Sequence, residues 1–371
     1  MTQPAASRSG SPSHRCARRT VSGPYQRLVQ RLEGLNVVAF VAFVGLGSSE
    51  ANAAPTAFPL GTPQGHLGCL ANAVNDSGVS VGYCTPIGGG RGRAVRWSST
   101  GFPTVLPDLG GDSNAVSINN AGTAVGYALA ATGFYRAIRW GSDNTITDLG
   151  TSPLDNEANA TGINNNGVIV GASSFFDPDP ESQQSRTHAV LWNTAGAITD
   201  LGVDRGDEYS VANAINDSNI IIGVSGRAGF DHGALWNSQG AMSFLSGLYT
   251  SNPIVELVGI NNSGIVAGYD APTAPGPQTH ALRWTNGTPV DLGTFSGASR
   301  PYAINSAGTV VGYSLVSGAA HPVRWTTTTI QDLGIPSSYA GCIVAAINTQ
   351  GMMVGYCFTA TQSYQAVRWL E

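Results

Sequence analysis

The sequence predicts an all-β protein, a seven-bladed β-propeller with four strands in each blade. One pattern, seen most clearly at residues 163–171, supports this prediction because it occurs seven times. All seven tryptophans stand at a single position of the same repeat. A repeat of about 45 residues with four short strands is typical of a propeller blade, whereas the coils of a β-solenoid are usually shorter. The pattern's asparagine is Asn75, Asn119, Asn164, Asn216, Asn261, Asn305 and Asn348, and the tryptophan is Trp97, Trp140, Trp192, Trp236, Trp284, Trp325 and Trp369.

The N-terminal residues 1–53 have the features of a secretory signal peptide. Several arginines precede an apolar run over 37–47, and Ala51, Asn52 and Ala53 follow as a small-residue cleavage site. The run is too short to span a bilayer as a helix. We therefore expect cleavage after Ala53, in preference to a retained anchor, and a single propeller domain over 54–371. The expected location is secreted, either extracellular or periplasmic.

The mature chain is expected to be acidic. All 18 basic residues are arginine, which excludes lysine Schiff-base chemistry. Removal of 1–53 takes away six Arg and two Glu, so the mature net charge becomes 12 − 21 = −9. This charge argues against nucleic acid or an anionic membrane as a partner. No other segment is apolar enough to span a membrane, and we expect a monomer without a cofactor.

Each repeat divides into four strands with recognisable ends. The first strand ends in the repeated Ile-Asn pair or its equivalent, and the second follows a tight turn. In that turn the Asn bonds its own backbone, and a Gly three residues later adopts a positive φ. The fourth copy has Asn219 at the Gly position, the residue next most tolerant of that conformation. The third strand ends in Trp and the fourth in Asp-Leu-Gly, which occurs at 108–110, 148–150, 200–202, 291–293 and 332–334.

The two chain ends predict how the propeller closes. The last repeat stops shortly after Trp369 and lacks a fourth strand. Residues 57–61 form a spare strand whose Leu60 and Gly61 stand before Asn75 at the spacing that Gly150 keeps from Asn164. We therefore expect the N-terminal strand to complete the last blade and close the ring, which removes exposed sheet edges.

The variable connections are the expected binding surface. Strands two to three and four to one have long connections, which should lie together on the face opposite the tight hairpins, and loops on a rigid scaffold often carry function. The longest link between strands two and three lies within 173–187 and contains Phe175, Phe176, Asp177, Asp179 and Glu181. Aromatic rings beside carboxylates suit sugar stacking, calcium or a partner protein. A tolerated insertion is the alternative, because added loop length costs little entropy.

Four cysteines occupy matching places in the first and last repeats. Cys69 and Cys84 have the same offsets from Asn75 that Cys342 and Cys357 have from Asn348. In a secreted protein we expect two disulfides, Cys69–Cys84 and Cys342–Cys357, each across one hairpin. A glycine bulge in the turn would spoil that opposition. Pairing between the first and last blades, and a four-cysteine zinc site, remain alternatives.

Two sets of polar residues near the tryptophans are interpreted as structural. Four histidines stand four residues before a Trp, and equivalent places in different blades are too far apart to share one metal. We expect each to bond within its own blade. Arginines directly before Trp are expected to pair with the aspartate of Asp-Leu-Gly across strands three and four. The histidines are His188, His232, His280 and His321, and the arginines are Arg96, Arg139, Arg283, Arg324 and Arg368.

These repeated words resemble the bacterial "extracellular repeat, HAF family" proteins, over nearly all of 57–371. The His-Ala-Phe word appears as His188-Ala189-Val190, His280-Ala281-Leu282 and, more loosely, His321-Pro322-Val323, without its Phe. The Ile-Asn-x-x-Gly, Val-Gly-Tyr and Asp-Leu-Gly words match better. The resemblance implies an exported repeat protein of undefined activity and adds no catalytic residue.

The sequence favours a binding or adhesion scaffold that acts through its variable loop face, with an extracellular glycan or surface protein as partner. No catalytic serine, zinc or phosphate-loop spacing stands out in the sequence. The alternative is a polysaccharide-directed enzyme, a lyase or glycosidase, with acidic residues at the central funnel. Because propellers host both classes, the fold alone does not decide between them.

Overall fold

The structure is a computed structural model that describes residues 55–177, 185–227, 230–249, 253–272, 279–327 and 329–370. All of them belong to one compact unit, Val37–Glu371. The expected signal peptide, residues 1–53, lies outside the described residues. The described residues form β-strands and turns, and no helix among them is long and apolar enough to cross a membrane.

Six of the seven repeats contribute four strands each, and the last contributes three, to which the N-terminal strand β1 is added. The first strands, here called inner strands, are β2 (His66–Val74), β6 (Gly110–Ile118), β10 (Glu157–Ile163), β14 (Tyr209–Ile215), β18 (Pro253–Ile260), β22 (Ser299–Ile304) and β26 (Gly341–Ile347). The second strands are β3 (Ser80–Pro86), β7 (Ala124–Ala130), β11 (Ile169–Phe176), β15 (Ile221–Arg227), β19 (Val266–Pro272), β23 (Val310–Val316) and β27 (Met353–Phe358).

The outer half of each repeat holds the remaining two strands. The third strands are β4 (Arg93–Trp97), β8 (Tyr135–Trp140), β12 (Ser185–Trp192), β16 (Phe230–Trp236), β20 (His280–Thr285), β24 (Ala319–Trp325) and β28 (Tyr364–Leu370). The fourth strands are β5 (Pro103–Val105), β9 (Ile146–Asp148), β13 (Ile198–Asp200), β17 (Met242–Leu245), β21 (Thr288–Asp291), β25 (Ile330–Asp332) and β1 (Thr56–Pro59).

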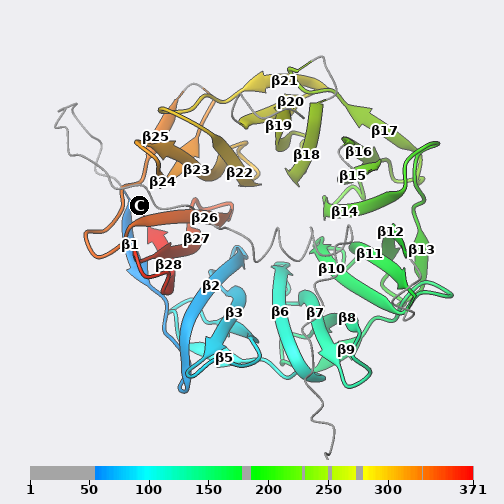
Figure 1. The fold of residues 1–371 in the computed structure, drawn as a ribbon, viewed down its shortest axis with the longest axis horizontal. Helices are drawn as coiled ribbons and strands as arrows, with labels where there is room; N and C mark the ends of the chain where they lie inside the picture. Colours follow the sequence, from blue (N-terminus) through cyan, green and yellow to red (C-terminus); the bar gives the residue numbers. More distant parts are fainter. Residues whose placement is uncertain are drawn as a thin grey trace, which may run out of the picture. The chain divides into compact units, whose positions relative to one another are not determined.

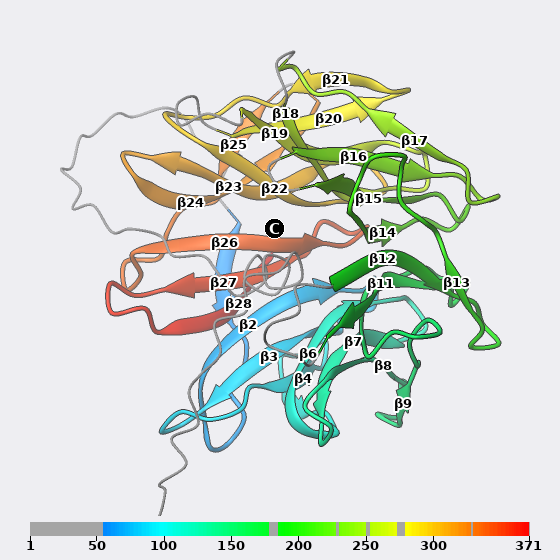
Figure 2. The same ribbon diagram turned by 45° about the vertical axis from the view of Figure 1, so that its right-hand side comes forward.

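The strands form five four-stranded antiparallel sheets and one eight-stranded sheet within the described residues. A single parallel bridge, Thr187 to Tyr209, joins the two halves of the larger sheet, and each half has the same four-strand order as the others. Figure 1 shows the sheets following one another around a common centre, with the inner strands nearest to it. Figure 2 shows the same sheets turned, each stepping outward from its inner strand.

The N-terminal strand completes the sheet of the last repeat. β1 lies antiparallel beside β28, with Thr56 opposite Leu370 and Pro59 opposite Val367. In Figure 1 this blue strand lies against the red C-terminal strands. β2 also contacts β26, β27 and β28, so the first and last repeats are neighbours in space.

Two register shifts in each inner hairpin cancel. The turn after β2 holds three residues, since Asn75 N–H donates to Val79 O and Gly78 takes a positive φ of 75°. A bulge between Ala71 and Ala73 then shifts the register back. The turn chemistry is as predicted, and Asn219 has a φ of 59° in its copy. The glycine bulge that would spoil the opposition of the cysteines is present in the turn, but the second bulge restores the register by one residue.

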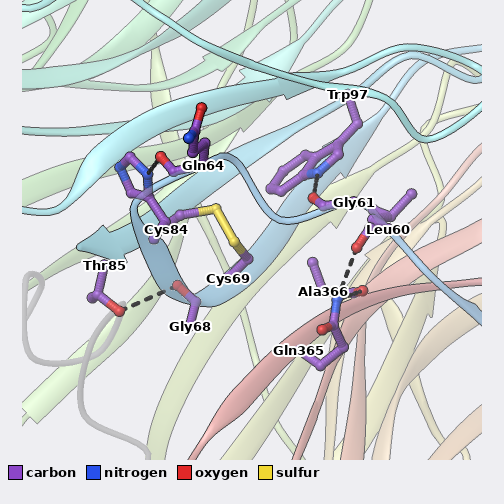
Figure 3. Close-up of a disulfide and its surroundings, with 11 residues drawn as sticks. Leu60, Gly61, Gln64, Gly68, Cys69, Cys84, Thr85, Trp97, Gln365 and Ala366 are labelled. Carbon is purple, nitrogen blue, oxygen red and sulfur yellow. Dashed lines mark hydrogen bonds between the residues drawn. A yellow bond between two sulfur atoms is a disulfide. The ribbon is translucent and has the colours of Figure 1, made fainter. Parts of the chain in front are cut away.

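Cys69 and Cys84 therefore lie directly opposite and form a disulfide, as Cys342 and Cys357 do in the last repeat. Both predicted bonds are confirmed, and pairing between blades is wrong. Figure 3 shows the first bond near Trp97 and Leu60, at the junction with the last repeat.

The glycine of each Val-Gly-Tyr word is required by close approach of two strands. A Cβ on Gly82 would lie 2.0 Å from the carbonyl oxygen of Leu70 across the bulge. The equivalent contact is 2.0 to 2.2 Å in the other six repeats. No side chain fits at that distance, so the repeated glycine follows from the repeated bulge.

The hydrophobic core consists of clusters between consecutive repeats. Each of the seven clusters contains one of the seven tryptophans, and every tryptophan is at most 1% exposed. The cluster of Trp97 joins Leu60 and Ala366 of the last sheet to the first repeat. The Trp97 indole N–H also donates to Gly61 O at 2.7 Å (Figure 3). Each tryptophan thus ties its repeat to the preceding one.

One predicted strand end is wrong. In the Asp-Leu-Gly word at 108–110, Asp108 and Leu109 lie between β5 and β6 and Gly110 begins β6, so the word is not at the end of β5. Leu106 is the structural equivalent of the leucine that follows the fourth strand in other repeats. Its N–H donates to Ala94 O, as Leu149 N–H donates to Ala137 O in the second repeat. Leu106 is fully buried, whereas Leu109 only packs at the edge of the cluster. The buried leucine and not the three-letter word determines the register.

Candidate functional site

The hairpin end of the inner strands carries a ring of buried asparagines that the sequence explains only in part. The Asn75 side chain accepts Val79 N–H at 3.0 Å, as a type I turn requires, but its amide also donates to Asn119 O of the next repeat at 3.1 Å. Every repeat has both bonds, and the last donates from Asn348 to Asn75 O at 3.1 Å. We call these seven residues the inner asparagine ring.

A second, exposed ring follows one residue later. Asp76 N–H donates to the side chain of Asn120 in the next repeat, and four similar bonds follow the same rule. All five acceptors are Asp or Asn. Among the described residues, the bond is missing at the two places where Ser306 or Thr349 would be the acceptor, because the hydroxyl of a shorter side chain does not reach the N–H of the preceding repeat. The members of this outer hairpin ring are Asp76, Asn120, Asn165, Asp217, Asn262, Ser306 and Thr349.

The two carboxylates of the outer hairpin ring are held ionised. Partial burial raises the pKa of Asp76, but hydrogen bonds from Thr349 and Asn120 outweigh it and lower the pKa overall. The same balance, with Asn165 and Asn262 as donors, lowers the pKa of Asp217. A cavity of about 250 Å³ lies among the seven repeats at this end. The polar groups that line it are largely hydrogen-bonded to one another, which marks the inner asparagine ring and the outer hairpin ring as scaffold.

The histidines near the tryptophans bond within their own repeats, as predicted. His280 Nδ1 lies 2.7 Å from Asp291 of the Asp-Leu-Gly word, and His188 and His321 make the same contact with Asp200 and Asp332. The other oxygen of Asp291 accepts Gly293 N–H at 2.7 Å. His232, whose repeat lacks the aspartate, packs edge-on against Phe244. No cluster of three or more metal-ligating side chains occurs among the described residues.

The predicted pairing of the arginines beside Trp with those aspartates is wrong. The aspartates take the residue four before Trp, so Asp148 pairs with Arg136 at 3.0 Å. Arg96 instead reaches into the next repeat and donates to Gly122 O at 2.7 Å and Gly141 O at 2.8 Å. The residue four before Trp and the arginine directly before Trp are three positions apart on the third strand. Residues an odd number of positions apart point to opposite faces of a strand, so only one of the two can meet the aspartate.

The predicted binding loop is only partly described. Phe175 and Phe176 belong to β11 and pair with β12, so they extend a strand and do not lie in a loop. Asn156 holds the end of that strand through two hydrogen bonds with the backbone of Phe176, at 2.7 and 3.0 Å. Asp177 follows β11, and Asp179 and Glu181 lie outside the described residues.

Arg300 and Glu256 lie on two neighbouring inner strands and meet between them. They stand on β22 and β18, with the guanidinium 3.9 Å from the carboxylate. The Tyr269 hydroxyl donates to Glu256 and accepts from Arg300, whose guanidinium also lies 4.2 Å from the centre of the Tyr269 ring. The Arg300 side chain is 27% exposed, so solvent reaches it.

More tyrosines surround this pair. The rings of Tyr302 and Tyr313 lie 6.2 Å apart, and those of Tyr356 and Tyr364 lie 5.8 Å apart. We define the tyrosine–arginine cluster as Glu256, Tyr269, Arg300, Tyr302, Tyr313 and Tyr356. It draws on repeats five, six and seven, and Tyr83 of the first repeat lies close enough to interact electrostatically with Tyr356.

The electrostatics of the cluster keep Arg300 charged and the phenols protonated. Burial lowers the pKa of Arg300, but Tyr269, Tyr302 and Glu256 outweigh burial and raise it overall. Burial raises the pKa of Tyr302 and of Tyr356. The cluster thus offers one permanent cation and several hydroxyl donors at neutral pH.

One further buried carboxyl lies on an inner strand, β10. Glu157 is 8% exposed, and burial raises its pKa to about 7, although a hydrogen bond from Tyr135 N–H opposes the shift. A carboxyl with a pKa near 7 exchanges a proton readily at neutral pH.

The tyrosines of the cluster carry a sequence signal, whereas Arg300 and Glu256 do not. Tyr269, Tyr313 and Tyr356 are the last letters of Val-Gly-Tyr or a close variant of it. The residues opposite that place are of six kinds in the seven repeats, and only the second and third repeats share one: Leu70, Asn114, Asn159, Val211, Glu256, Arg300 and Ile343. A repeat is recognised from the residues that its copies share. A position whose residue varies between copies, such as that of Arg300 or Glu256, is therefore not part of the recognised pattern.

Comparison with known proteins identifies the fold. A scan against protein-family models and a search of curated proteins both find no match. Among solved structures, a streptogramin B lyase has a TM-score of 0.56 and 13% identity, over 87% of this chain and 99% of that chain. The propeller domain of the Trilobed protease from Pyrococcus furiosus has a TM-score of 0.56 and 10% identity, over 82% and 94%. At such identities the likeness concerns the fold alone, which is a β-propeller.

Proposed function

We propose that residues 54–371 form a closed seven-bladed propeller. Four observations support this. The eight-stranded sheet divides at one bridge into two blades of four strands. β1 completes the last sheet, and the cluster of Trp97 joins that sheet to the first repeat. The inner asparagine ring returns from Asn348 to Asn75.

We further propose that the protein is exported and acts as a monomer. Two disulfides, Cys69–Cys84 and Cys342–Cys357, suit an oxidising compartment outside the cytoplasm. The resemblance to the HAF repeat proteins and the expected cleavage after Ala53 agree with that location. Closure leaves no long sheet edge for pairing with a second copy, which favours a monomer.

We infer that the protein is a binding scaffold whose ligand contacts the tyrosine–arginine cluster. The observation that carries this inference is the partly exposed Arg300 against the ring of Tyr269, with further tyrosines from neighbouring repeats around it. Tyrosine and arginine dominate the energetics of binding surfaces because they combine large contact area with polar groups. Sugars and protein loops both use such surfaces, so an extracellular glycan or a surface protein is the proposed partner.

The test is a glycan array and a cell-surface binding assay on the mature protein. We compare the wild type with Tyr302→Ala and, as a matched control, Tyr135→Ala. Both variants lose a partly buried ring that is paired with another tyrosine, but Tyr135 lies in the second repeat, outside the cluster. Loss of a central anchor costs about 2 kcal/mol or more, which is a fall in affinity of about 30-fold or more. Equal loss in both variants, or none in Tyr302→Ala, would overturn the inference.

The predicted loop is tested separately by replacement of 178–184 with a short glycine-serine linker. The flanking Phe175 and Phe176 stay in place because they belong to β11. If the loop contributes contacts through Asp179 or Glu181, the variant binds fewer of the glycans on the array than the wild type does. An unchanged profile removes the loop from the binding surface.

A polysaccharide-directed lyase or glycosidase is the second candidate, and Glu157 is the observation that favours it. A carboxyl with its pKa raised to about 7 suits a general acid. Release of reducing ends or unsaturated sugars from a polysaccharide panel would support this activity, provided that Glu157→Gln abolishes it and Glu208→Gln does not.

A further inference from the structure

A polar cavity of about 370 Å³ lies between the second and third repeats at the hairpin end. It is separate from the tyrosine–arginine cluster, which belongs to repeats five to seven. Its walls carry hydroxyl groups from both repeats, including Thr123, Ser142 and Thr147 on one side and Thr194 on the other, together with Arg139 and Asp143. The volume lies within the range of about 300–1,000 Å³ that is typical of small-molecule sites.

The neighbouring gap between the first and second repeats is bridged by an arginine. There, the equivalent arginine, Arg96, crosses to the second repeat and donates to Gly122 O and Gly141 O. These two bonds close the gap. Arg368 makes a similar contact, donating to Ser99 O at 2.6 Å.

Arg139 behaves differently although it occupies the same position. It lies on β8 opposite Val125 and Thr147, as Arg96 lies opposite Val81 and Thr104. Among the described residues its guanidinium has neither a hydrogen-bond acceptor nor an ion-pair partner. The gap between repeats two and three therefore stays open, with an uncommitted cation in its wall.

The other charged group at the cavity has its own partners. Asp143 Oδ1 accepts both the backbone N–H and the hydroxyl of Thr145, at 3.0 and 2.7 Å. Its charge also interacts with Arg96. The second oxygen of Asp143 remains able to accept a hydrogen bond from a ligand hydroxyl.

We propose that this cavity binds a small polyhydroxylated carboxylic acid, of which a hexuronic acid is the type, with the carboxylate on Arg139 and the hydroxyls on the threonine and serine side chains. A guanidinium binds a carboxylate through two parallel N–H donors, which gives both strength and orientation. The hydroxyl-rich walls and Asp143 match the donors and acceptors of a sugar ring. This site does not depend on the function proposed for the tyrosine–arginine cluster.

The experiment is isothermal titration of the mature protein with glucuronate and galacturonate, using glucose as the uncharged probe. We expect saturable binding of at least one uronate and binding of glucose at least about tenfold weaker, because glucose lacks the group that pairs with Arg139. Arg139→Gln should weaken uronate binding by a similar factor. The melting temperature of each variant verifies that it is folded.

Two further variants make the result decisive. Arg324→Gln changes the equivalent position in the sixth repeat, where the guanidinium bonds Gln331, and should leave uronate binding unchanged. Thr147→Trp keeps Arg139 but places a large ring in the cavity from an exposed position, and should abolish binding. The proposal is overturned if neither uronate binds, if glucose binds equally well, or if Arg139→Gln or Thr147→Trp binds as the wild type does.

Discussion

Two levels of the same inner strands differ in a way that separates scaffold from site. At the hairpin end, all seven repeats hold the same buried Asn with the same two bonds. Opposite the last residue of the Val-Gly-Tyr word, the inner strands carry six kinds of residue in the seven repeats, and Glu256 and Arg300 meet there among tyrosines. A group that is needed for ring assembly must appear in every repeat, whereas a ligand needs only one copy. The chemistry specific to this protein therefore lies where the repeat is broken.

The largest expected effect concerns the scaffold common to all repeats. Trp140→Ala should lower the free energy of unfolding by about 3–5 kcal/mol, because it removes a fully buried ring between two repeats. Urea denaturation measures the loss. Trp140→Phe keeps most of the packing but loses the indole bond to Pro107 O and should cost clearly less. Loss of under about 1 kcal/mol in the alanine variant would contradict the role of the tryptophans.

A second prediction concerns Glu157, a buried carboxyl at the start of the inner strand β10. Its folded pKa of about 7 exceeds the ordinary 4.5, so the unfolded chain releases this proton first as pH rises. The folded state is therefore destabilised progressively between pH 4.5 and 7, by up to about 3 kcal/mol. Glu157→Gln should lose this dependence and be more stable than the wild type at pH 8.

Denaturation curves of both proteins from pH 4.5 to 8 measure the effect. The aspartates with lowered pKa values, Asp76 and Asp217, titrate below this window and affect both proteins alike. Parallel stability profiles for the wild type and the variant would show that Glu157 ionises normally in the folded protein.

The third prediction compares the two hairpin rings. Asn348→Ala removes a buried side chain that donates to Asn75 O and accepts Met352 N–H, and should cost about 2–3 kcal/mol. Asn120→Ala removes an exposed member of the outer hairpin ring and should cost about 1 kcal/mol or less. Chemical denaturation of both variants provides the comparison. Equal costs would mean that burial does not distinguish the rings.

The smallest effect is expected at the histidines. His280→Ala removes a contact with Asp291 between partly exposed side chains, which should change the free energy of unfolding by less than about 1 kcal/mol. A melting curve near neutral pH is sufficient. A loss as large as that of Trp140→Ala would assign these residues a structural role that their exposure does not support.

The sequence predicts the parts of the fold that depend on one repeat at a time. The turn asparagines, the four strands, the strand that joins β28 and both disulfides follow from spacing within a repeat. The second bond of Asn75, to Asn119 O, and the contacts of Arg96 join residues 26 to 45 positions apart in neighbouring repeats. Such partners become visible only when the repeats are placed side by side.

The candidate site was harder to predict for a different reason. Arg300 and Glu256 belong to no repeated word, and they meet because β18 and β22 are neighbours. The sequence predicts a binding loop that contains Phe175 and Phe176. Aromatic residues are as compatible with a loop of that kind as with the end of β11, where they lie. Composition alone does not distinguish these two settings.

The most direct test measures the affinity of one ligand from the glycan array or surface assay for two variants, Arg300→Gln in the tyrosine–arginine cluster and Asn120→Ala in the outer hairpin ring. Both side chains are polar, accessible and hydrogen-bonded to a neighbouring repeat. If the varied level of the inner strands is the site and the two hairpin rings are scaffold, Arg300→Gln weakens binding by about tenfold or more and Asn120→Ala leaves it unchanged. Full affinity in folded Arg300→Gln, or loss of binding in folded Asn120→Ala, would contradict the account.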